Sequence, residues 1–217
     1  MVNGILTNSE VWHPIKESHI EILQNVDLIL LKKLTNAHSK TAKEAFYLEA
    51  GLLPLKFVIM KRRLMYLHTL LCRRDDDLTK KFYFVQKAVF TKDDWYGTVM
   101  ADRLELNISH TDEEISKMSK DKFRKIVKAA VEQGALEYLN SRAKSHTKSA
   151  GLVKMKFERE NYFENPNFSK SEVELLFALR TRTVRNVKKN FPNQYNNNMT
   201  CQLCSLHVDC QENLLLC

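Results

Sequence analysis

The sequence predicts a mainly α-helical protein, an irregular helical bundle with a small zinc-knuckle segment near its C-terminus. Apolar residues recur at helical spacing through most of the chain, and helix-capping patterns separate these stretches. No internal repeat or heptad run appears, so neither a solenoid nor a coiled coil is expected. The 217 residues are 44% hydrophobic, enough for one large domain or two small ones. Five glycines and four prolines exclude collagen-like and Pro/Gly-rich disordered classes.

The first half of the chain is expected to form five helices. Apolar spacing places them over 16–34, 42–50, 55–72, 78–89 and 95–106. Thr41 and Glu44 have the spacing of a capping box for the second helix, and Gly51 suits the position just after it. Pro54 is placed to start the third helix. Cys72, at the end of that helix, is expected to be a buried thiol that only packs.

The second half is expected to hold the longest helix, over 120–145, and a further helix over 170–183. Capping boxes begin at Thr111 and at Ser169. Apolar and basic residues alternate over 151–157, which predicts either a short strand or an extended linker. We divide the chain into a helical region over 1–110, a basic helical linker over 111–165, and a basic helix with a zinc knuckle over 166–217.

Positive charge is concentrated in the second half of the chain. The net charge is +8, and the segment 117–156 alone has eleven Lys and Arg against three Asp and Glu. Such a concentration favours a polyanionic partner, RNA and/or DNA before a membrane. A merely solvated helix surface is the alternative. The candidate nucleic-acid-binding residues are Lys117, Lys120, Lys122, Arg124, Lys125, Lys128, Arg180, Arg182, Arg185, Lys188 and Lys189.

Four cysteines lie in the last seventeen residues, and the spacing between the first two is Cys-x2-Cys. Clustered cysteines in a chain without a visible secretory signal indicate metal ligands before disulfides. One zinc ion is expected, bound by Cys201, Cys204, Cys217 and, as the preferred fourth ligand, Cys210. His207 is the competing fourth ligand. Unpaired thiols in a disordered tail are the alternative to a metal site.

Catalytic motifs are absent from the sequence. No Gly-x-Gly-x-x-Gly, P-loop or His-Glu-x-x-His pattern occurs, and Asp93-Asp94 stands where carboxylates cap a helix. We therefore expect no enzyme activity and no small-molecule substrate. No apolar run approaches the roughly 20 residues of a membrane span, and no secretory signal is visible. The expected location is nuclear or cytoplasmic.

Long strings at both ends of the chain resemble a known family. Residues 2–12 (VNGILTNSEVW) and 26–71 are similar to the region after the palm in reverse transcriptases of eukaryotic non-LTR retrotransposons. Residues 177–217 resemble the zinc knuckle of those proteins and its basic lead-in, with the pattern Cys-x2-Cys-x8-His-x3-Cys. Cys201, Cys204 and Cys217 match its cysteines, and Asn213 stands where the family has histidine.

The resemblance implies a fragment that binds template RNA or target DNA. The catalytic fingers and palm of such polymerases would precede Met1, so a truncated copy without polymerase activity is expected. Two other interpretations remain: a helical protein–protein interaction module domesticated from such an element, and a non-functional remnant of a decayed one.

Overall fold

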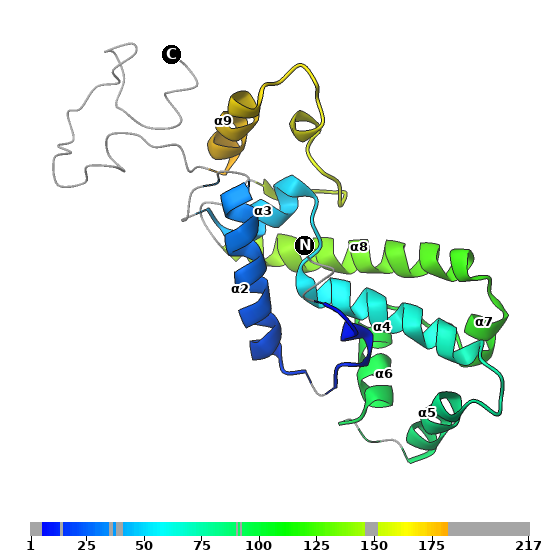
Figure 1. The fold of residues 1–217 in the computed structure, drawn as a ribbon. Coiled ribbons are helices and arrows are strands. Elements are labelled where there is room, and N and C mark those ends of the chain that lie inside the picture. The colour runs from blue at the N-terminus through cyan, green and yellow to red at the C-terminus, as the bar shows by residue number, and fades with distance from the viewer. Residues whose placement is uncertain are drawn as a thin grey trace, which may run out of the picture.

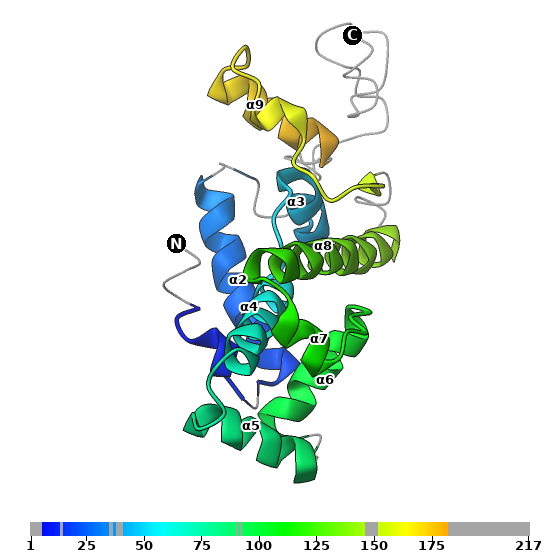
Figure 2. The same ribbon diagram turned by 90° about the vertical axis from the view of Figure 1, so that its right-hand side faces the viewer.

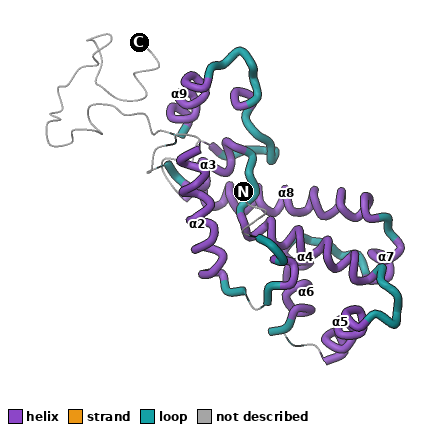
Figure 3. Tube along the Cα trace, viewed as in Figure 1, coloured by secondary structure: helices purple, strands orange, loops and turns teal. Residues whose placement is uncertain are grey.

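The computed structural model describes residues 6–13, 15–34, 37, 41–89, 91, 93–145 and 152–181. The chain is mainly helical, as predicted, and no β-strand occurs within those ranges (Figures 1 and 3). The elements are η1 (Ser9–Val11), α2 (Glu17–Leu34), α3 (Lys43–Ala50), α4 (Leu55–Leu71), α5 (Leu78–Val89), α6 (Trp95–Glu105), α7 (Asp112–Lys117), α8 (Lys120–Ser145), η3 (Asn161–Phe163) and α9 (Lys170–Arg180). Within the part of the chain described, no helix has the length and apolarity that crossing a bilayer requires.

Helices α4 and α8 form an antiparallel pair at the centre of the fold (Figure 1). Near the end of α4, the His68 ring stacks on Phe123 from the start of α8, with centroids 5.4 Å apart. Near the start of α4, Phe57 meets Tyr138 from the second half of α8, with centroids 5.7 Å apart. Gly134 leaves room for this ring, because a Cβ on it would lie 3.3 Å from Phe57 Cε1 and 2.9 Å from Leu106 Cδ2 at the end of α6.

Two apolar clusters share α8. The first cluster joins α4, α5, α6 and α7 to residues from the N-terminal half of α8, including Phe123, Val127 and Val131. The second joins α2, α3 and α9 to Leu136 and Leu139 farther along the same helix. Figure 2 shows the result, with α3 and α9 at one end of the molecule and α5 at the other. Helix α8 is therefore buried on two different faces in succession, and the outward side of its first half stays exposed.

Three predicted helix starts are confirmed. The Asp94 carboxylate accepts a hydrogen bond from Gly97 N at 2.7 Å and caps α6. Thr111 with Glu114, and Ser169 with Glu172, form reciprocal capping boxes at the starts of α7 and α9. The hydrogen bonds lower the pKa of the Glu114 and Glu172 carboxyls, because they stabilise the ionised form.

Replacing Thr111 by alanine is expected to lower the free energy of unfolding by about 1 kcal/mol, because the backbone N–H of Glu114 loses its side-chain acceptor. Chemical denaturation measures the change. Thr111→Ser is the matched control, since it keeps the hydroxyl and should stay close to the wild type. Equal losses in the two variants would show that the methyl group, rather than the cap, carries the effect.

The capping box predicted at Thr41 and Glu44 is wrong. Ala42 is the N-cap of α3 and makes no side-chain hydrogen bond, while the buried Thr41 hydroxyl has no partner. The Glu44 carboxylate instead accepts from Arg142 Nε of α8 at 3.2 Å. Glu44 therefore forms an ion pair with a distant helix instead of the local capping hydrogen bond that the sequence pattern predicted.

The segment 152–157 is an irregular connection rather than a strand. Its backbone bonds to a side chain: the Asn140 amide donates to Lys154 O at 2.8 Å, and Lys154 N donates to the Asn140 oxygen at 3.1 Å. It then passes against Gly51, whose φ is +60°. A Cβ on Gly51 would lie 2.5 Å from Arg159 N, so both the backbone conformation and the contact require glycine. Of the two predicted alternatives for this segment, the strand is wrong over 152–157.

Cys72 is exposed, which corrects the prediction of a buried thiol. The residue is the C-cap of α4, one position beyond the last helical residue, so its side chain leaves the core face of that helix. Its sulfur lies 3.6 Å from Ser116 O.

Candidate nucleic-acid interface

Six of the predicted basic residues lie together on the exposed side of α8 and at the end of α7. Phe123, Val127 and Val131 follow at four-residue steps and turn one side of α8 into the first apolar cluster. The basic residues on the other sides of α8, and Lys117 at the end of α7, lie outside this core, and all six are exposed. We call this set the α8 basic surface; it comprises Lys117, Lys120, Lys122, Arg124, Lys125 and Lys128.

Few carboxylates neutralise the α8 basic surface. Arg124 pairs with Asp121 at 2.8 Å, and Lys128 lies 3.8 Å from Glu132. Within the ranges that the structure describes, the other four lysines make no side-chain hydrogen bond or ion pair. Their ammonium groups are therefore available to an external anion.

Arg180, a seventh predicted residue, has a different environment. Its guanidinium binds the fully buried carboxylate of Glu49 through Nε at 2.7 Å and Nη2 at 3.0 Å, and lies 3.4 Å from Glu160. The hydrogen bonds to Glu49 raise the pKa of Arg180 above its usual value. Tyr162 also donates to Glu49, at 2.7 Å. Arg180 thus joins α9 to α3, the two helices that pack against the second half of α8 and not against its first half, where the α8 basic surface lies.

The remaining predicted site residues lie outside the described residues. They are Arg182, Arg185, Lys188, Lys189 and the zinc ligands Cys201, Cys204, Cys210 and Cys217. The zinc site therefore stays a prediction. Among the residues that are described, no group of three His, Cys, Asp or Glu side chains is arranged to hold a metal ion.

A cationic groove adjoins the α8 basic surface, and the sequence did not reveal it. The groove has a volume of about 530 Å³ and runs along α4 beside η1. Lys61, Arg62 and Lys120 contribute its cations, and Glu10 is the one carboxylate among its lining residues. Lys120 belongs both to the groove and to the α8 basic surface, so the two are continuous.

The three consecutive basic residues of α4 have separate roles, although in the sequence they only interrupt an apolar helix. Lys61 lines the groove and makes no hydrogen bond or ion pair among the described residues. Arg62 donates to the Leu6 carbonyl and so holds the N-terminal segment on α4. Arg63 is buried in an ion pair with Asp102 of α6, at 2.6 Å. Burial raises the pKa of Asp102 to about 6, although the nearby guanidinium acts in the opposite direction.

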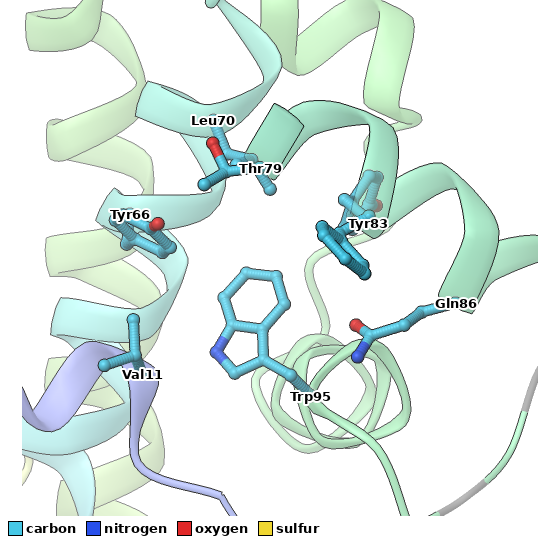
Figure 4. A pocket seen from close by; sticks show the side chains of 8 residues that line it. Val11, Tyr66, Leu70, Thr79, Tyr83, Gln86 and Trp95 are labelled. Atoms are coloured by element: carbon cyan, nitrogen blue, oxygen red, sulfur yellow. The ribbon is translucent and has the colours of Figure 1, made fainter. Parts of the chain in front are cut away.

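A second, aromatic pocket continues the groove toward α5 (Figure 4). It has a volume of about 250 Å³, and the rings of Tyr66, Phe82, Tyr83 and Trp95 line it. The Trp95 indole N–H donates to the Glu10 carbonyl at 2.9 Å, which fixes the ring in the pocket. The Tyr83 hydroxyl donates to Asp112 at 2.9 Å; burial, reinforced by this carboxylate, raises the pKa of Tyr83 above its usual value.

Comparisons with known proteins found no match to a family model, to a curated protein or to a solved structure.

Proposed function

We propose that this chain binds the phosphate backbone of RNA and DNA through the α8 basic surface, without catalysing a reaction. The observation that carries the proposal is the group of exposed lysines without carboxylate partners at the end of α7 and along the first half of α8. Lysine contacts to phosphate release condensed counterions and supply most of the free energy of sequence-independent binding. The resemblance to the post-palm region of reverse transcriptases points to the same ligand.

The arrangement supports backbone contacts rather than base readout. Lysine ammonium groups are flexible point charges, and they carry none of the fixed planar donor geometry with which arginine reads a guanine edge. The one arginine of the α8 basic surface, Arg124, is held by Asp121 at 2.8 Å. We therefore expect similar affinities for different sequences, with dissociation constants of about 10⁻⁴ to 10⁻⁶ M at physiological salt.

The test is a triple substitution of Lys117, Lys122 and Lys125 by alanine. Each lost phosphate contact should reduce the slope of log affinity against log salt concentration by about 0.7–0.9, so the triple variant should lose about 2 to 3 in slope. Fluorescence anisotropy with a mixed-sequence DNA duplex over a salt series measures it. Lys120 is left intact, because it also lines the groove.

The matched control replaces three exposed lysines elsewhere, Lys16, Lys33 and Lys156, and so makes the same change in net charge. We expect its salt slope to equal that of the wild type. If both triple variants lost the same slope, binding would follow the net charge of the protein, and the α8 basic surface would not be the site.

A further inference from the structure

The cationic groove and the aromatic pocket form one continuous surface. Tyr66 lines both of them, and the neighbouring residues Glu10 and Val11 line one each. The surface therefore runs from Lys120 at the start of α8, along α4, to the rings beside α5. Cations lie at one end of it and aromatic side chains at the other.

The groove end suits an anionic ligand. Lys61 and Lys120 make no hydrogen bond or ion pair within the described ranges, so both ammonium groups can approach the same guest. Arg62 adds a third positive charge, although its guanidinium also contacts the Leu6 carbonyl and lies 3.4 Å from Ser9 Oγ. Three cations against the single carboxylate of Glu10 give the groove a positive potential.

The pocket end offers flat apolar surfaces that are already in place. Phe82 is 60% exposed, a large unburied area for a phenylalanine. Trp95 is held by its hydrogen bond to the Glu10 carbonyl, and Tyr66 meets it edge-on, with centroids 5.7 Å apart. A planar guest could stack on these rings without first ordering them, which removes one cost of binding.

We infer that this surface binds single-stranded nucleic acid, with phosphates at Lys61 and Lys120 and unpaired bases on Phe82 and Trp95. A single strand presents both charged phosphates and free base faces, whereas a duplex keeps its base faces stacked inside. The inference rests on the proposed function and extends it by naming the form of nucleic acid that this groove selects. The α8 basic surface, by contrast, would hold the backbone of either form.

The experiment compares oligothymidylate with a duplex that has the same number of phosphates, using the full chain and its Phe82→Ala variant. Base–aromatic stacking measured by alanine substitution predicts a loss of about 5- to 150-fold in single-strand affinity. Duplex affinity should remain that of the wild type. Because Phe82 is largely exposed, the thermal unfolding midpoint should change little, and this is measured alongside.

The matched control is Phe84→Ala. Phe84 is also exposed on α5, but it lines neither the groove nor the pocket. We expect it to leave both affinities unchanged. The second variant, Lys61→Ala, should weaken single-strand binding and reduce its salt slope by about 0.7.

Unchanged single-strand affinity in Phe82→Ala would overturn the inference. The exposed rings would then be assigned to contact with a protein partner. Equal losses for single strand and duplex would also overturn it. In both of these cases the proposed function would stand, since duplex binding through the α8 basic surface is measured separately. In this experiment, a wild-type chain that binds neither form would remove the proposed function as well.

Discussion

Asp102→Ala is expected to lower the free energy of unfolding by about 3–5 kcal/mol, because it leaves the charge of Arg63 buried without a counter-ion. The two side chains are 9% and 3% exposed, and Arg63 Nη1 lies 2.6 Å from Asp102 Oδ2. The buried Arg63 Nε has no hydrogen-bond partner, so the guanidinium has little else to stabilise it. Arg63 and Asp102 line a pocket of about 220 Å³, and water from this pocket would have to solvate the unpaired guanidinium.

Urea denaturation at pH 8 measures this loss. Burial raises the pKa of Asp102 to about 6, so pH 8 keeps the carboxylate of the wild type ionised. The control removes both charges, in Arg63→Met/Asp102→Leu, and should recover most of the stability because two apolar side chains can fill the same space. A loss below about 1 kcal/mol in Asp102→Ala would mean that water already reaches Arg63.

The second large effect is expected from Glu49→Ala, and it should be local. The fully buried Glu49 carboxylate accepts hydrogen bonds from Tyr162 and from two nitrogens of Arg180, and thereby holds η3 and α9 on α3. Hydrogen bonds to charged groups contribute about 1.5–3 kcal/mol each to stability when they are buried. Arg180 is 43% exposed and can be hydrated after the substitution, so we expect a total loss of about 2–3 kcal/mol.

Amide hydrogen exchange distinguishes local from global loss. In Glu49→Ala, residues 152–181 should exchange faster while α4 and the first half of α8 keep their protection. Glu160→Ala is the control on the same guanidinium: Glu160 is 26% exposed, lies 3.4 Å from Arg180 and also pairs with Lys154 at 2.7 Å, and its loss should cost about 1 kcal/mol. Uniform loss of protection across all helices would show that α9 is part of the global cooperative unit.

The helices were predictable because their signals are local. Capping boxes act over three residues, and the apolar spacing that buries Phe123 and Val127 repeats within one turn. The wrong capping box at Glu44 and the unforeseen pairing of Arg180 both concern charged residues whose partners are remote in the sequence. Glu44 pairs with Arg142, 98 positions away, and Arg180 pairs with Glu49, 131 positions away. No local pattern predicts such pairs, because only the folded chain brings them together.

The candidate site also has a part that local sequence signals predict and a part that they do not. The exposed lysines of α8 follow from the helical period and were predicted by residue. The groove was not predicted, because it forms only when Lys61 of α4 lies beside Lys120 of α8. The aromatic pocket was not predicted either, because Tyr66 and Trp95 come from different helices. Nothing in the sequence around Lys61, Arg62 and Arg63 predicts which of these three cations lines the groove and which is buried.

The burial of α8 on two faces in succession fixes its rotation about its own axis. Turning the helix to suit one apolar cluster would withdraw Leu136 and Leu139 from the other, so neither cluster alone sets the angle. The backbone positions of Lys122, Lys125 and Lys128 are consequently fixed, and each lies about 4.5 Å farther along the helix axis than the one before it. The fold therefore sets the spacing of the backbone positions that carry these lysines, while their flexible side chains can still adjust to a bound anion.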